Sequence, residues 1–160
     1  MLQQIEKNKF SGFERVLFNK ELTNLIHCPV IAVGDYIIPS TVETIGVEAF
    51  SQCKGITSII IPEGIKKIAC MAFENCTGLS TLTLPGSVEE LGFGSFSDCT
   101  GLRSIYVHSK SILSLKKDSQ VFQNIDKSNC ILFVMQGTKK DYQLANQWNE
   151  FRNIIEIDKI

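Results

Sequence analysis

The middle of this sequence repeats itself with a period of 23 residues. The repeats open at Ile38-Pro39, Ile61-Pro62 and Leu84-Pro85. Each continues through a phenylalanine to a cysteine: Phe50 and Cys53, Phe73 and Cys76, Phe96 and Cys99. A fixed period of about 20 to 50 residues is typical of solenoids, in which each coil buries its apolar face against its neighbours. The sequence therefore predicts a solenoid with a column of phenylalanines and a column of cysteines.

Each repeat contains two apolar segments with the spacing of short strands. The first alternates, as in Ile59-Ile60-Ile61, Leu82-Thr83-Leu84 and Ile105-Tyr106-Val107, which is typical of a strand with one buried face. A proline that cannot donate to a strand ladder then ends the segment. The second segment is an apolar pair such as Val42 and Ile45, and a turn closed by the phenylalanine follows. A glycine two residues after each cysteine, at positions 55, 78 and 101, is expected to supply a positive φ.

A fourth coil and a cap follow the regular repeats. Phe122 continues the phenylalanine column at a spacing of 26, so about three residues are inserted near Ser109 to Ser119. Residues 131–134 are predicted to form the strand of this coil. Thr138 has the chemistry of a helix N-cap, and the apolar spacing after it predicts a capping helix that runs through Trp148.

The first 35 residues break the period. Residues 16–18 and 25–28 are two β-prone runs that predict a hairpin. Residues 2–5 resemble the first half of one more repeat strand, so we expect the chain to begin partway through an array. The whole of residues 1–160 is predicted to form one domain, with an N-terminal module (1–35), repeats (36–134) and a C-terminal cap (135–160).

Composition excludes several classes of function. The formal net charge is −1, from 16 basic and 17 acidic residues, so no basic field is available for nucleic acid. No apolar run is long enough for a transmembrane segment, and the N-terminus has no apolar segment of a secretory signal. The six cysteines are predicted to be reduced, buried thiols.

The sequence also predicts no catalytic, cofactor or metal site. It has only two histidines, and a serine triad through His108 fails because the adjacent Ser109 would point to the opposite face of a strand. No Cys-x-x-Cys pair and no glycine-rich phosphate loop is present. We therefore expect a protein that is not an enzyme and that uses no cofactor.

The repeat unit Ile-Pro-x-x-Val-x-x-Ile-Gly-x-x-Ala-Phe-x-x-Cys-x-Gly-Ile/Leu-x-x-Ile/Leu resembles the BspA-like leucine-rich repeats of Bacteroides-type bacteria and some protozoan parasites. The hairpin and the tail from Gly137 to Phe151 also resemble parts of such arrays, so the resemblance covers roughly residues 14 to 157. It implies a β-rich α/β solenoid, a right-handed leucine-rich-repeat superhelix. It also implies a secreted or surface-anchored adhesion protein without catalytic activity. The sequence departs from the pattern at Ala69 and Ser95.

The candidate binding residues are those expected to point outward from the main sheet. Ile37, Ile60, Thr83, Tyr106 and Phe133 fall between buried positions, and we call them the outward row. Four of these five residues are apolar or aromatic, and a contiguous exposed apolar patch commonly marks an interaction site. Arg103 lies at the edge of this row. The alternative is that β-propensity alone selects these residues, or that another chain covers them.

Two hypotheses about function remain open from the sequence. The first is a non-enzymatic protein-binding or cell-surface adhesion module whose partner is a protein of a host or bacterial surface. The second is a structural spacer within a larger surface protein, with no ligand of its own.

Charged residues form two further predicted columns on the second segment. Glu43, Lys66 and Glu89 occupy one column, and Thr44, Lys67 and Glu90 the next. We expect Lys66 to lie between the two glutamates of its column. Exposed pairs of this kind contribute little stability, but they favour the correct register between coils.

Overall fold

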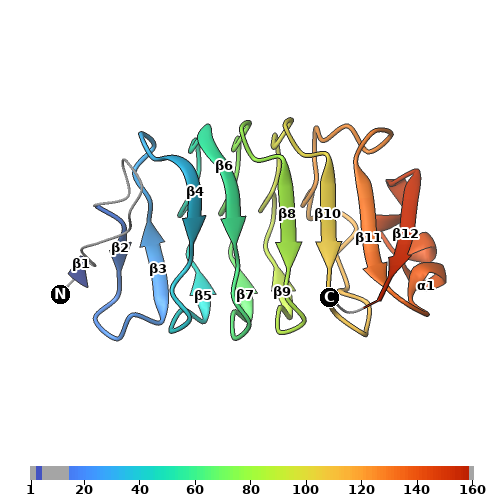
Figure 1. Ribbon diagram of the computed structural model, residues 1–160, viewed down its shortest axis with the longest axis horizontal. Helices are drawn as coiled ribbons and strands as arrows, with labels where there is room; N and C mark the ends of the chain where they lie inside the picture. The colour runs from blue at the N-terminus through green and yellow to red at the C-terminus, as the bar shows by residue number, and fades with distance from the viewer. Residues whose placement is uncertain (1–2, 5–14, 159–160) are drawn as a thin grey trace.

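The computed structural model describes residues 3–4 and 15–158, with side chains for 15–158. The chain winds into a solenoid built on two six-stranded sheets (Figure 1). Sheet A contains β1 (Gln3–Gln4), β2 (Leu17–Phe18), β3 (Asn24–His27), β5 (Thr44–Ile45), β7 (Lys67–Ile68) and β9 (Glu90–Leu91). Sheet B contains β4 (Val33–Ile37), β6 (Gly55–Ile60), β8 (Thr81–Leu84), β10 (Ser104–Val107), β11 (Ile131–Met135) and β12 (Asn153–Ile157).

The two sheets are staggered along the solenoid axis. Sheet A starts at the N-terminal end and stops at β9, whereas sheet B starts at β4 and continues to β12 (Figure 1). Between these limits each coil contributes one strand to each sheet. Ser58 pairs with Thr81 and Thr81 with Ser104, which is the predicted 23-residue register. The predicted solenoid with 23-residue coils is therefore confirmed.

The predicted phenylalanine column runs through the core. The rings of Phe50, Phe73, Phe96 and Phe122 are fully buried, and successive centroids lie 4.9, 5.1 and 5.9 Å apart in stacked geometry. Trp148 closes the C-terminal end of the column, with its centroid 4.9 Å from that of Phe122. Each buried ring contributes about 2–3 kcal/mol through the area that it removes from water.

The cysteine column is also present and consists of free thiols. Cys53, Cys76 and Cys99 are fully buried, and the thiols of Cys76 and Cys99 donate to carbonyls of the preceding coil, 3.1 Å from Phe50 O and 3.0 Å from Phe73 O. A hydrogen bond with the thiol of Cys99, together with burial, raises the pKa of Cys76. The Cys76 thiol therefore stays protonated near neutral pH.

The glycines that follow each cysteine were predicted to supply a positive φ, and this prediction was wrong. Gly78 and Gly101 do not have a positive φ. A Cβ atom at Gly78 would lie 2.3 Å from Lys54 O, and one at Gly101 would lie 2.2 Å from Thr77 O. Glycine is needed here because the backbone of the preceding coil approaches too closely for any side chain. The positive φ angles fall instead on the residues before the cysteines, Gln52, Asn75 and Asp98, and on Asn124 of the fourth coil.

The N-terminal module contains the predicted hairpin. β2 and β3 pair antiparallel, and the side-chain oxygen of Asn19 accepts from the backbone N–H groups of Thr23 and Asn24 to hold the turn. The expectation for residues 2–5 was wrong: β1 pairs antiparallel with β2, whereas the strands that successive repeats contribute pair in parallel. Residues 1–2 and 5–14 lie outside the described part of the chain.

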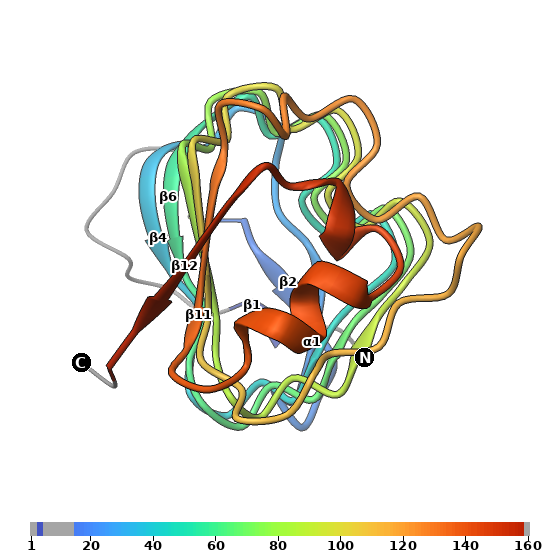
Figure 2. The same cartoon turned by 90° about the vertical axis from the view of Figure 1, so that its right-hand side faces the viewer.

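The C-terminal cap differs from the prediction in two ways. α1 spans only Lys139–Leu144, because Gln147 adopts a φ of 64° and Trp148–Glu150 forms a separate 3₁₀ turn, η1. Leu144, expected on the apolar face, is 83% exposed. The chain then returns as β12, which extends sheet B in parallel beside β11 and which the sequence analysis missed. Figure 2 shows α1 at the C-terminal end of the solenoid, away from the outward face of sheet B.

The charge columns align as predicted, but the ion pair forms in the other column. Thr44, Lys67 and Glu90 stack in register, and Lys67 Nζ lies 3.0 Å from Glu90 Oε1. Among the described residues, Lys66 makes no ion pair with either glutamate of its own column.

Candidate protein-binding surface

The strands of sheet B bring the five residues of the outward row together. Ile37 pairs with Ile60, and Tyr106 pairs with both Thr83 and Phe133. Because side chains alternate between the two faces of a strand, buried neighbours on each side force these residues outward. The row therefore lies on the outward face of sheet B, with every residue at least partly exposed.

The outward row combines exposed aliphatic residues with an aromatic pair. Ile37 and Ile60 are each 53% exposed, so the two adjacent isoleucines present about half of their surface to water. Tyr106 and Phe133 are half-buried because their rings stack on each other, with centroids 4.4 Å apart and planes 8° from parallel. Such a pair is held rigidly, which lowers the entropy that a partner would have to offset on binding.

The structure adds a sixth residue to the row. Ile155 on β12 pairs with Phe133 and is 44% exposed. Ile155 was not among the predicted residues because β12 was not predicted. The alternation in Ile154-Ile155-Glu156-Ile157 was the available signal.

A polar row runs beside the outward row on the same face. It is aligned by strand pairing and consists of Asp35, Ser58, Thr81, Ser104, Ile131 and Asn153. Five of these six residues carry a carboxylate, a hydroxyl or an amide. Thr57 donates to the carboxylate of Asp35 over 3.0 Å at the N-terminal end. The face therefore offers an apolar stripe with hydrogen-bonding groups along one side, the arrangement typical of protein interfaces.

Arg103 lies just before β10, at the end of the face where this strand starts. Its side chain is exposed, and one guanidinium nitrogen donates to the carbonyls of Thr100 and Leu102, each over 2.9 Å. The structure thus fixes Arg103 against the preceding turn. Its remaining N–H groups are the ones available to an acidic group on a partner.

More exposed apolar residues gather at the N-terminal edge of sheet B. Val30, Ile31 and Val33 are 54%, 72% and 47% exposed, and they precede or begin the edge strand β4. These residues were not among the predicted site residues, although Val30-Ile31 directly follows a proline in a turn. They form a separate group of exposed apolar residues at the opposite end of β4 from Ile37.

Neither a metal-binding cluster nor a membrane-spanning helix is found in the described part of the chain. Residues 3–4 and 15–158 contain no cluster of three or more His, Cys, Asp or Glu side chains arranged to hold a metal ion. Within the same residues, no helix is long and apolar enough to span a bilayer.

These features define a leucine-rich-repeat solenoid with an apolar stripe on its sheet. Residues 31–139 match the BspA type leucine-rich repeat region in six copies. Because this match covers more than half of the chain, the chain belongs to the BspA-type leucine-rich-repeat family. No curated protein is significantly similar to it in sequence.

Solved structures of bacterial proteins share the fold. A leucine-rich repeat protein from Eubacterium ventriosum is 26% identical, with a TM-score of 0.61 over 82% of this chain and 32% of that one. A leucine-rich cell surface protein from Faecalibacterium prausnitzii is 20% identical, with a TM-score of 0.70 over 96% of this chain and 41% of that one. The pneumococcal vaccine antigen PcpA is 19% identical, with a TM-score of 0.59 over 91% of this chain and 47% of that one. The chain spans less than half the length of each.

Proposed function

We propose that this chain is a non-enzymatic protein-binding or adhesion module that acts at a cell surface through the outward face of sheet B. The observation that carries the proposal is the row from Ile37 to Ile155 on six paired strands, in which five of the six side chains are apolar or aromatic and all stay at least partly accessible. The cell-surface relative from Faecalibacterium prausnitzii supports the location. The partner is a protein, because an apolar stripe beside hydroxyl groups suits a mixed polypeptide surface.

Tyr106 is the expected anchor of the interface. It lies within the row, its ring is oriented by stacking on Phe133, and tyrosine is among the residues that most often dominate binding energy. The hydroxyl group adds a directed hydrogen bond to the apolar contact. The two exposed isoleucines on β4 and β6 extend this contact along the sheet.

A double variant tests the proposal. Tyr106→Ala combined with Ile60→Asp removes the anchor and places a charge in the stripe, and both side chains point away from the core. We expect wild-type protein immobilised on beads to capture a partner from host matrix or bacterial surface extracts, and the double variant to lose that partner. Thermal melting of both proteins checks that the fold is intact.

Two controls separate a specific site from general stickiness. Lys66→Ser changes the residue just before β7 of sheet A, on the other side of the coil, and Leu144→Asp places the same charge on an exposed apolar residue of α1. Both variants should retain the partner. Equal capture by the Tyr106/Ile60 double variant would exclude this face as the site, and the structural spacer would then be the better account of the chain.

A further inference from the structure

The second sheet carries an open strand edge, at β9. In the preceding coils, each strand of sheet A is paired on its C-terminal side by the next coil. The carbonyl of Glu43 accepts from the N–H groups of Lys66 (2.8 Å) and Lys67 (3.3 Å), and the carbonyl of Ile45 accepts from Ala69 (2.9 Å). These bonds show which groups of each strand face the coil that follows.

The same positions of β9 have no such neighbour. In the next coil, the carbonyls of Lys66 and Ile68 accept from the N–H groups of Glu89 and Gly92, each over 2.8 Å. The equivalent carbonyls of β9 belong to Glu89 and Leu91, and no residue of the described chain donates to either. β9 is thus a strand edge with unused backbone acceptors.

The insertion in the fourth coil explains the gap. Leu113 and Leu115 are buried, so this segment still contributes to the core. However, the C-terminal cap holds it: Trp148 Nε1 donates to Leu113 O and Gln147 Nε2 donates to Lys116 O, each over 2.7 Å. The segment therefore pairs with the cap and not with β9, and the loop bulges beyond the other coils (Figure 2).

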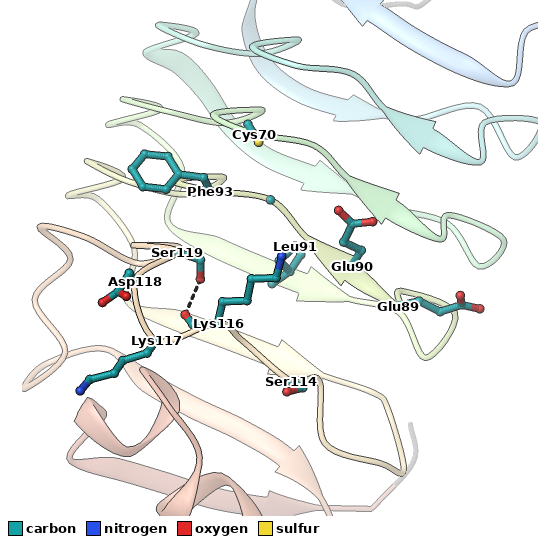
Figure 3. Close-up of a pocket in the computed structure, with 11 residues that line it drawn as sticks. Cys70, Glu89, Glu90, Leu91, Phe93, Ser114, Lys116, Lys117, Asp118 and Ser119 are labelled. Carbon is teal, nitrogen blue, oxygen red and sulfur yellow. Dashed lines mark hydrogen bonds between the residues drawn. The ribbon is translucent and has the colours of Figure 1, made fainter.

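The result is a groove of about 490 Å³ between β9 and the inserted loop. Figure 3 shows Glu89 and Glu90 on the β9 side, whereas Lys116, Lys117 and Asp118 line the loop side, with the Lys116 side chain extending toward β9. Leu91 and the half-exposed ring of Phe93 supply apolar surface between them. The groove therefore offers backbone acceptors, a small apolar surface and charges on both sides.

We propose that this groove binds an extended peptide segment that adds to β9 as the next strand of sheet A. An extended polypeptide is the ligand that supplies N–H donors at the spacing of strand carbonyls, as in other cases of strand addition. The charge columns define the side chains that suit the position. Glu90 already pairs with Lys67 of the preceding coil, and Glu89 has no ion-pair partner in the described chain, so a neighbouring strand with two adjacent basic residues is favoured.

The chain itself provides a suitable probe. A capped nine-residue peptide with the sequence of residues 61–69 carries the two basic residues and the same N–H groups that pair with β5 in the intact solenoid. In an NMR titration of the ¹⁵N-labelled full chain, saturable amide shifts are expected at residues 89–93 and 114–119. Shifts confined to the edge strand β4, or no shifts at millimolar peptide, would overturn the proposal.

Modified peptides test the backbone contacts without any risk to folding. N-methylation at the positions of Lys66 and Ala69 removes the donors of the two shorter hydrogen bonds, and we expect affinity to fall at least about tenfold. N-methylation at Glu63, whose N–H donates to no other described coil, is the matched control and should have little effect. Equal binding by the doubly methylated peptide would show that no strand is added to β9.

Variants of the chain test the charge contribution. Glu89→Gln should weaken the peptide about two- to fivefold, whereas Glu43→Gln, the same change in the same column two coils away, should not. Equal effects of both changes would mean that the peptide responds to net charge and not to this groove. The Tyr106/Ile60 double variant should bind the peptide normally, which separates this site from the face of sheet B.

Discussion

The regular coils and the fourth coil solve the same packing problem with different residues. Residues 38–107 repeat one pattern of proline, phenylalanine, cysteine and glycine, and their coils contribute to both sheets. The fourth coil retains Phe122 in the ring column but carries Ile125 where the others have cysteine, and it adds a strand only to sheet B. Regular repeats are therefore required where the next coil is itself a repeat, and not where a cap follows.

The cap replaces the missing contacts with side chains. Gln147 accepts from Val121 N and donates to Lys116 O and Ser119 Oγ, so one amide holds three groups of the fourth coil. Trp148 covers the last ring of the phenylalanine column. Because the fourth coil does not follow the repeat, it adds no strand beside β9, and the groove forms there. The part of the chain that departs from the repeat is therefore also a candidate functional site.

The largest expected effect lies in the middle of the regular coils. Phe73 stacks between Phe50 and Phe96, so Phe73→Ala leaves a cavity that neither neighbouring coil can fill. We expect the free energy of unfolding to fall by about 3–5 kcal/mol, measured by urea denaturation. Coincident unfolding curves for the variant and the wild type would show that the stability of the solenoid does not depend on the phenylalanine column.

Close approach of the coils predicts the next effect. Gly78→Ala would place a Cβ atom 2.3 Å from Lys54 O, which forces adjacent coils apart and should cost about 3 kcal/mol. Gly86→Ala is the control, since its nearest neighbour, His108 O, lies at 3.3 Å and its φ is not positive. The control should change stability little, and equal losses in the two variants would contradict the close-approach explanation.

The glycines also show which features of the structure could be predicted from the sequence alone. The period defined the coils, the register, the ring column and the outward row, because a strict repeat leaves one way to stack. It did not reveal why Gly78 is glycine, since close approach between coils depends on their spacing in three dimensions. β12, Ile155 and the groove at β9 were missed for the same reason: each depends on how nonrepetitive residues pack against the last coil.

A smaller loss of stability is expected from a substitution in the C-terminal cap. Gln147→Met keeps the size of the side chain but removes its three hydrogen bonds, and Val121 N is then left buried without this acceptor. We expect a loss of about 2 kcal/mol, with hydrogen exchange increased mainly in the fourth coil. Gln143→Met on the exposed side of α1 is the matched control. If exchange instead rises evenly through all coils, Gln147 does not act as a local substitute for a fifth coil.

The smallest expected effect is a gain in stability. Ala49, Ala72 and Ser95 occupy one buried column beside the phenylalanines, and Ser95 Oγ has no hydrogen-bond partner among the described residues. Ser95→Ala removes a buried polar group and restores the repeat, so unfolding should cost about 1 kcal/mol more.

A nearby serine provides the opposite case for comparison. Ser97 is also buried, but its hydroxyl donates to Gly94 O over 3.0 Å, so Ser97→Ala should destabilise the protein by a similar amount. Paired urea denaturation curves measure both changes. A loss of stability in Ser95→Ala would mean that its hydroxyl is satisfied in solution, and the third coil would then depart from the repeat at no energetic cost.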